Sequence, residues 1–123
     1  MDYAHIVSLH YLLGAAGKDS GDYNAVAGDT GVAVMRSDWR HHTFHRIVDN
    51  GGASGSVAVI QMTAIPEEHD RDEEDWVTIA TLNDAAPYAM FSNVLLPHVR
   101  AKRTGGSTTA IKVVVSSCNN KIE

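Results

Sequence analysis

Short stretches in which apolar and polar residues alternate recur through most of this sequence, and segments rich in Gly, Asn, Asp or Pro separate them. Alternation with a period of two is typical of strands that bury one face, whereas a sustained helical stripe of apolar residues is hard to find. The alternating runs number about seven to nine, enough for two packed sheets. The sequence therefore predicts an all-β fold, an antiparallel β-sandwich or jelly roll.

Two glycine pairs lie between strongly alternating runs. Residues 43–48 and 56–64 flank the first pair, and residues 98–103 and 108–115 flank the second. Because glycine adopts turn conformations at little steric cost, we expect each pair of runs to form an antiparallel hairpin. Neither glycine pair precedes a helix, so neither is a candidate phosphate-binding loop.

Other strands are expected at residues 76–82 and 88–91, with shorter ones at 23–27 and 31–35. Residues 3–16 are apolar enough for a short helix or a strand.

A length of 123 residues suits one domain, so we expect a single domain over residues 1–123. Residues 1–17 form either part of that domain or an arm that docks on a neighbouring subunit.

The composition limits the partners. Hydrophobic residues make up 44% and charged residues 20% of the chain, and no apolar run approaches the ~18 residues of a membrane span. A net charge of −5 argues against a general nucleic-acid partner, because phosphate binding needs a concentrated basic surface. Asp2 stands where a secretory signal would be basic, and the single Cys118 suits a reducing compartment. We expect a cytoplasmically made protein with no membrane or nucleic-acid partner.

Residues 66–75 hold seven acids and one arginine. So dense a run of like charge is expected to form a solvated loop between two strands. Hard cations such as calcium take several carboxylate oxygens, which makes Asp70, Asp72 and Asp75 the weak candidates for metal binding. The run lacks the central glycine of an EF-hand loop, so no metal site is predicted.

Seven histidines are many for this length, and three of them lie close together at His41, His42 and His45. In a strand His41 and His45 share one face, where they are expected to be exposed or to contact another subunit. A zinc site would need fixed tetrahedral geometry that this pattern does not supply. Among the basic residues, Arg100 and Lys102 are expected to share a face that is solvated or meets a partner's acidic patch.

No motif for catalysis is present: the sequence lacks a nucleophile elbow and a dinucleotide fingerprint, and Cys118 lies in no recognisable active-site motif. We therefore predict no catalytic residue, no cofactor and no enzymatic activity. Trp39 and Trp76 are expected to pack in the core or on a sheet. The alternative is a sugar-binding module in which Trp39, Trp76 or Tyr88 stacks on carbohydrate.

The order of features over residues 43–116 resembles small structural proteins of tailed bacteriophages. The shared layout is a strand, a polar loop, a tryptophan strand, a turn, a proline before an arginine strand, a glycine pair and a closing β-branched strand. The sequence departs from it where the long acidic stretch replaces a short polar loop. The matching segments are residues 57–64, 67–75, 75–82, 96–102, 105–106 and 109–115.

The resemblance implies a β-sandwich or jelly-roll protein of the virion, made in the host cytoplasm. It implies a capsid decoration or cement protein, or another minor capsid protein, that binds the major capsid protein or another virion protein noncovalently and forms a homo-oligomer, with a trimer favoured. The alternative is a tail or fibre attachment module. The residues expected at subunit contacts are Tyr3, Ile6, Leu9, Tyr11, Leu12, His41, His42 and His45.

Overall fold

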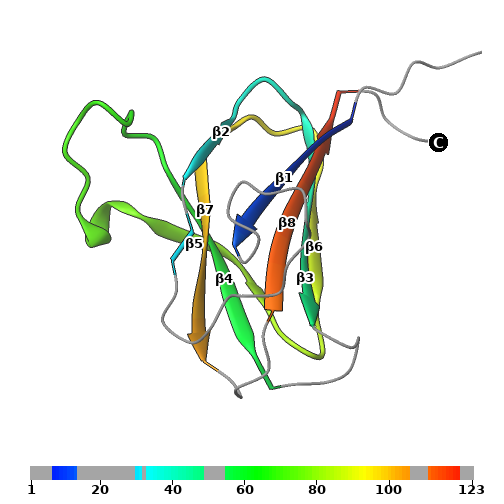
Figure 1. Ribbon diagram of the computed structural model, residues 1–123. Helices are drawn as coiled ribbons and strands as arrows, with labels where there is room; N and C mark the ends of the chain where they lie inside the picture. The colour runs from blue at the N-terminus through cyan, green and yellow to red at the C-terminus, as the bar shows by residue number, and fades with distance from the viewer. Residues whose placement is uncertain (1–6, 14–29, 32, 49–54, 106–110, 120–123) are drawn as a thin grey trace, which may run out of the picture.

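The computed structural model describes residues 7–13, 30–31, 33–48, 55–105 and 111–119 (Figure 1). Within these ranges the chain forms eight strands and one short 3-10 turn, and every strand pairing is antiparallel. No helix in the described part is long and apolar enough to cross a membrane. The elements are β1 (Val7–Leu13), β2 (Val34–Arg36), β3 (His41–Val48), β4 (Val57–Thr63), η2 (Glu73–Asp75), β5 (Val77–Leu82), β6 (Tyr88–Phe91), β7 (Leu96–Gly105) and β8 (Ile111–Cys118).

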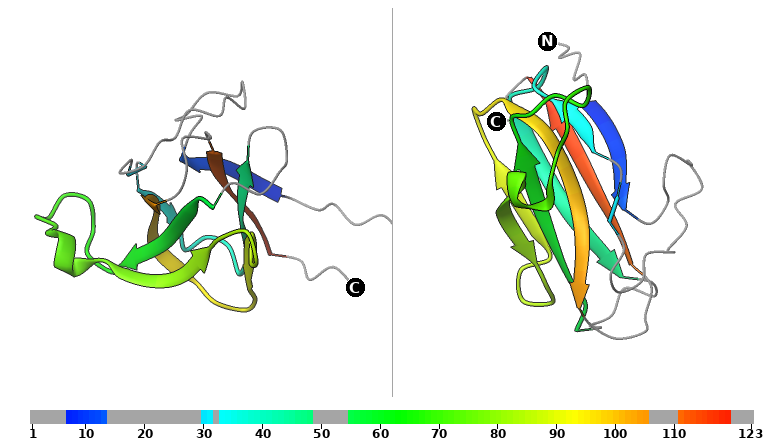
Figure 2. Two further views of the ribbon diagram at one scale, coloured as in Figure 1. Left: turned by 90° about the horizontal axis from the view of Figure 1, so that it is seen from below. Right: turned by 90° about the vertical axis from the view of Figure 1, so that its left-hand side faces the viewer.

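The strands form two four-stranded sheets that face each other (Figure 2). Sheet A has the order β1-β8-β3-β6, and sheet B has the order β2-β7-β4-β5. The predicted all-β sandwich is therefore confirmed, and the number of described strands falls within the expected range. The segment predicted as helix or strand near the N-terminus contains the edge strand β1, which pairs with β8.

The core consists of alternate side chains from both sheets. In β3 and β8 buried and partly exposed residues alternate strictly, as expected for strands that turn one face inward. Phe44 of sheet A and Ile60 and Val99 of sheet B are fully buried. The Phe44 and Phe91 rings meet edge to face, with centroids 5.8 Å apart. Each fully buried side chain of this size stabilises the fold by about 1.5–3 kcal/mol.

The predicted hairpins are both wrong. β3 lies in sheet A and β4 in sheet B, and in the same way β7 lies in sheet B and β8 in sheet A. Each pair therefore crosses the core instead of exchanging backbone hydrogen bonds. Alternation in a sequence identifies a strand with one buried face. It does not show whether the next strand pairs with it in the same sheet or lies in the facing sheet, because both arrangements bury that face.

The short strands predicted in the first third have different outcomes. Residues 23–27 lie outside the described part of the chain. The run predicted at 31–35 overlaps β2, which begins and ends later than predicted and pairs with β7. The predicted strands at 76–82 and 88–91 are confirmed as β5 and β6.

Several inward-facing positions carry arginine. Arg46 on β3 is 4% exposed, and Arg103 on β7 is fully buried. The Arg46 guanidinium donates to Ser56 Oγ at 2.6 Å and to Asp84 Oδ1 at 2.9 Å. The other carboxylate oxygen of Asp84 accepts from the backbone N–H of Gly55 at 2.7 Å. Paired in this way, the buried charge ties β3 of sheet A to the residues that precede β4 of sheet B.

Gly31 lies between the backbones of β1 in sheet A and β7 in sheet B. Its N–H donates to the carbonyl oxygen of Ala101 on β7 at 2.9 Å. A Cβ atom at this position would overlap the carbonyl oxygen of Leu12 on β1. Because the Leu12 and Ala101 atoms at this position belong to the backbone, they cannot move aside as a flexible side chain would.

Replacement of Gly31 by alanine is expected to lower the free energy of unfolding by about 2 kcal/mol or more, the range of a badly overpacked site. Gly105→Ala is the matched control, because a Cβ there meets no atom within 4 Å. The control should stay within about 0.5 kcal/mol of the native chain. Urea unfolding of the three proteins measures both effects, and equal losses for the two variants would contradict the close approach.

Candidate interaction surface

The outer face of sheet A consists of the side chains that alternate with the core positions of its strands. The pairing registers place these side chains in rows that cross the sheet from β1 to β6. One row runs Tyr11, Val114, His45, Tyr88. The adjacent row runs Leu9, Ser116, Thr43, Met90.

Large apolar side chains of this face are open to solvent on both edge strands. Leu9 of β1 is 57% exposed, and on β6 Tyr88 is 55% and Met90 67% exposed. These exposed fractions are high for apolar side chains, whose removal from water is favourable. Apolar groups clustered on one face in this way are typical of a surface that binds another protein.

The same face is free of carboxylates in its described positions. Its one formally charged side chain is Lys112, whose Nζ lies 5.7 Å from the centroid of the Tyr11 ring. The whole chain, by contrast, has 15 acidic residues and a net charge of −5. The electrostatic repulsion of another negatively charged protein is therefore weaker at this face than at parts of the surface that carry carboxylates.

The predicted contact residues separate into three groups. His41 and His45 lie on the outer face of sheet A, as their spacing predicts, together with Leu9 and Tyr11. Leu12 and His42 are each 1% exposed, so their prediction as contact residues is wrong. Alternation turns both side chains inward, since their neighbours Tyr11 and His41 face outward. The bulge between Tyr11 and Leu13 brings Leu13 into the core as well. The remaining predicted contacts, Tyr3 and Ile6, lie outside the described residues.

His42 belongs to a buried polar chain at one end of the sandwich. Its Nε2 lies 3.1 Å from the carbonyl oxygen of Val94, and its Nδ1 lies 2.9 Å from Ser117 Oγ. A carbonyl only accepts, so Nε2 carries the proton, and in the neutral ring Nδ1 accepts from the Ser117 hydroxyl. Arg36 donates to Ser117 Oγ at 3.2 Å and to the Ser8 carbonyl oxygen at 2.9 Å. These hydrogen bonds join β2 of sheet B to the ends of β1, β3 and β8 in sheet A.

Burial lowers the pKa of His42 below its ordinary value of 6.5, and the positive charge of Arg36 lowers it further. The pKa of His10 on β1 is also lowered, first by burial and then by Arg36. The neutral imidazoles are therefore favoured in the folded domain. Sequence alternation places His42 inward, but it does not show that Arg36 and Ser117 lie beside it.

The outer face of sheet B differs from that of sheet A because the acidic segment covers part of it. Arg100 on β7 is 8% exposed and donates to Glu73 Oε2 at 2.6 Å and to Gln61 Oε1 at 2.9 Å. Lys102 Nζ lies 4.0 Å from the same carboxylate oxygen of Glu73. The pairing holds the pKa of Glu73 below its usual value, chiefly through the hydrogen bond from Arg100. Arg100 and Lys102, which the sequence predicts to face solvent or a partner's acidic patch, thus lie against Glu73 of the same chain.

Trp76 holds this loop in place. The Arg100 guanidinium lies 4.2 Å and that of Arg71 5.4 Å from the centroid of the indole ring. Arg71 Nε also donates to the carbonyl oxygen of Ile65 at 2.8 Å. Trp76 therefore packs on sheet B through two cations, and it precedes β5 instead of lying in the core.

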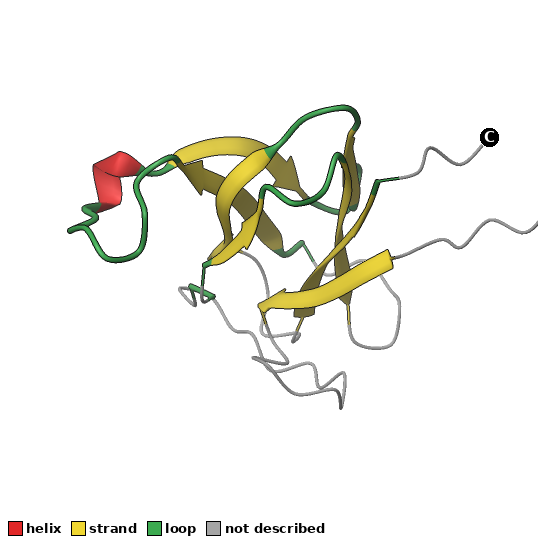
Figure 3. Ribbon diagram, turned by 90° about the horizontal axis from the view of Figure 1, so that it is seen from above, coloured by secondary structure: helices red, strands yellow, loops and turns green. Residues whose placement is uncertain are grey.

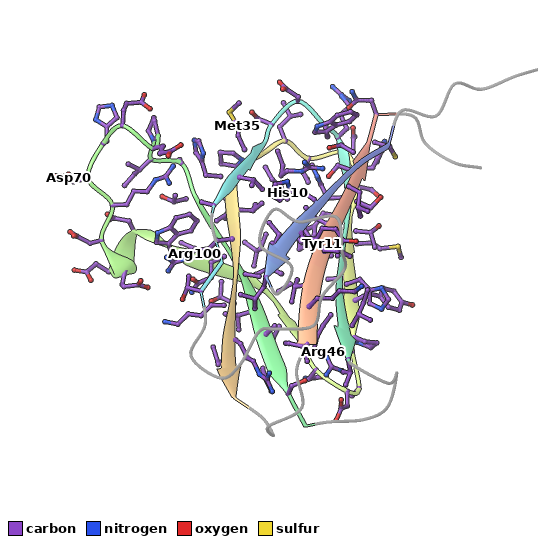
Figure 4. The ribbon with its side chains drawn as sticks, viewed as in Figure 1. His10, Tyr11, Met35, Arg46, Asp70 and Arg100 are labelled. Carbon is purple, nitrogen blue, oxygen red and sulfur yellow. The ribbon has the colours of Figure 1, made fainter. Side chains whose placement is uncertain are left out.

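The weak metal candidates do not converge. Asp70 and Asp72 are exposed, while Asp75 Oδ2 accepts from the Asp72 backbone N–H at 2.8 Å. The part of the chain that the structure describes contains no group of three or more side chains that could hold a metal ion. Figure 3 shows the 3-10 turn on a projection beyond sheet B, and Figure 4 shows Asp70 there, well away from Tyr11. The histidines of the outer face of sheet A therefore do not meet the acidic loop.

These features define a class of protein: an antiparallel β-sandwich with one sheet face open and the other partly covered by an acidic loop. The chain matches no protein-family model and has no significant match among curated proteins. Its structure is similar to the crystal structure of the SPBc2 prophage-derived protein YomS, with a TM-score of 0.59 over 97% of this chain and 98% of that chain. The sequences are 10% identical, so the likeness shows a common fold.

Acid is expected to destabilise the domain through its buried histidine. Because the pKa of His42 is lowered in the folded state, the unfolded chain takes up a proton at a higher pH than the folded domain. The contribution of His42 to the free energy of unfolding is therefore fully present above pH 6.5, and it is lost as the pH falls below that value. Thermal unfolding of the native chain and of His42→Gln across this range tests the assignment. An equally steep loss of stability in the variant would contradict it.

Removal of the indole is expected to release the acidic loop. Two cation–π contacts at a partly exposed site contribute about 1–2 kcal/mol together, so Trp76→Ala should raise the open population of the loop roughly 5- to 30-fold. Trypsin cleavage after Arg71, followed by mass spectrometry, reports that population. Trp39→Ala is the matched control and should leave the rate unchanged. A native cleavage rate for Trp76→Ala would show that other contacts hold the loop.

Proposed function

We propose that this chain is a structural protein of a tailed-bacteriophage virion, and that it decorates or cements the capsid by noncovalent contacts. The observation that carries the proposal is the outer face of sheet A, with exposed apolar side chains on two edge strands and no carboxylate among its described positions. Such a face suits the burial of a protein partner, which is the task of a protein that binds an assembled shell.

The fold supports the phage assignment. The prophage-derived protein YomS shares the architecture over 97% of this chain. The order of strands and turns over residues 43–116 also resembles structural proteins of tailed phages. Neither likeness depends on the outer face of sheet A, so fold and surface support the proposal separately.

The role needs no chemical step. A cement protein acts through rigidity and summed contact area, and binding at several sites multiplies weak contacts. In this proposal the partner is the major capsid protein or another virion protein, the protein resides in the virion, and it is not an enzyme.

A tail or fibre module that binds carbohydrate is the second candidate. The exposed ring of Tyr88 favours it, since sugars stack on open aromatic faces. Trp76 does not favour it, because two guanidinium groups already occupy positions near its ring. Trp39 is half-buried.

The native protein is expected to co-sediment with DNA-free heads of the phage whose genome encodes it, and to raise the melting temperature of those heads. A ligand that binds only the assembled state stabilises it by mass action, about 2.7 kcal/mol per site at 100 times Kd. Calorimetry of heads with and without the protein measures the shift.

Purified tails and host cell-wall glycans are the comparison ligands in the same assay. Binding to glycans, lost in Tyr88→Ala, would replace the capsid role by the adhesion role. Binding to tails alone would place the protein on the tail, and binding to no phage structure would refute the proposal.

A further inference from the structure

We propose that the outer face of sheet A binds a second copy of this chain, in a face-to-face pair related by a two-fold axis parallel to the strands. This inference rests on the proposed function, because it takes the same face to be a contact surface and names its occupant. Its basis is the order of side chains in the two rows: when a row is reversed, the apolar side chains of one edge strand lie over those of the other edge strand.

The geometry follows from the strand order. Let the axis lie in the interface, between the neighbouring central strands β8 and β3. A rotation of 180° about it places β1 of one copy over β6 of the other and β8 over β3. Heights along the strands are unchanged, so each row of one copy faces the same row of the second copy in reverse order.

The reversed rows cover the apolar side chains of the edge strands. Tyr11 faces Tyr88 of the second copy, and Leu9 faces Met90, so the exposed apolar side chains of both edges become covered. At the centre of the sheet the small polar Ser116 faces Thr43, and Val114 faces the His45 ring. The facing aromatic rings and the facing aliphatic side chains bury apolar surface, and the neutral hydroxyl groups can form hydrogen bonds with each other.

Charge favours the same arrangement. Lys112 is the neighbour of Ile47 across the axis, so each lysine faces an isoleucine and not a second lysine. Two chains of net charge −5 repel one another, and a face without described carboxylates is where that repulsion is least. The acidic loop contacts sheet B and projects on the side of the molecule away from sheet A (Figure 2).

The area of the face is sufficient for a specific contact. Strands spaced about 4.8 Å apart that rise about 3.3 Å per residue give a footprint of roughly 400 Å² per copy. Side-chain relief enlarges the accessible area beyond the footprint, so a pair buries on the order of 1,000 Å², the lower bound for a specific interface. A three-fold ring would use two different patches per subunit, whereas this face complements itself.

Sedimentation equilibrium of the full chain, from about 1 to about 200 μM, tests the pair, because this range detects dimers with a Kd of micromolar or tighter. The native chain is expected to give a dimer or an even multiple. Met90→Asp should weaken association at least 10-fold. Val77→Asp is the matched control, because Val77 is 60% exposed on β5 of sheet B, and it should associate as the native chain does.

A charge-reversal pair tests the register. Leu9 and Met90 occupy opposite edges of sheet A, three strand spacings or about 14 Å apart within one copy, too far for an ion pair. In the proposed dimer Leu9→Lys faces Met90→Asp of the second copy. The double variant should therefore recover the dimer that Met90→Asp loses, and this recovery should weaken at high salt.

A native monomer or trimer over the whole concentration range overturns the inference, as does equal dissociation in Val77→Asp. Failure of the double variant to recover the dimer overturns the two-fold register. Thermal melting of each variant shows that it is folded. Head binding by a monomeric native chain would overturn this pairing and leave the proposed function intact, while a dimer that binds no phage structure would do the reverse.

Discussion

The packing of two inner sheet faces is the interaction on which the rest of this structure depends. Phe44, Val113 and Val115 from sheet A meet Ile60, Val99 and Ala101 from sheet B, and all are fully buried. Because consecutive strands such as β3 and β4 cross from one sheet to the other, neither sheet can be completed without the other. The burial of apolar area thus fixes the strand order, which in turn fixes the rows on the outer faces.

Polar groups at the ends of this core complete the arrangement. Arg36 reaches Ser8 and Ser117, and Arg46 reaches Ser56 and Asp84, so both inward guanidinium groups join elements from different sheets. A buried charge without partners would cost several kcal/mol, whereas paired groups restrict the relative position of the sheets. The two outer faces then differ in chemistry, since one remains open and has no carboxylate among its described positions, while Glu73 and Trp76 cover the cations of the other.

The strands were predictable from the sequence, but their partners were not. Strand-forming residues locate β5 and β6, and alternation orients His41 and His45 outward, because both signals depend only on the local sequence and backbone geometry. It does not distinguish a hairpin from two strands on opposite sides of a core, which is why both predicted hairpins are wrong. The bulge that buries Leu13 beside Leu12 and the contact between Arg100 and Glu73 arise from tertiary packing, so no local pattern reports them.

One feature of the strand order governs how this chain can fold. β8 follows every other described strand in the sequence, yet it lies between β1 and β3. During synthesis the first 110 of 123 residues therefore precede the strand that joins the two parts of sheet A. Contacts between segments so distant in sequence close slowly, because the loop entropy is lost before the contacts form. Chaperone contact with the nascent chain should thus concentrate on β1 and β3, and premature termination before β8 should give an aggregation-prone product.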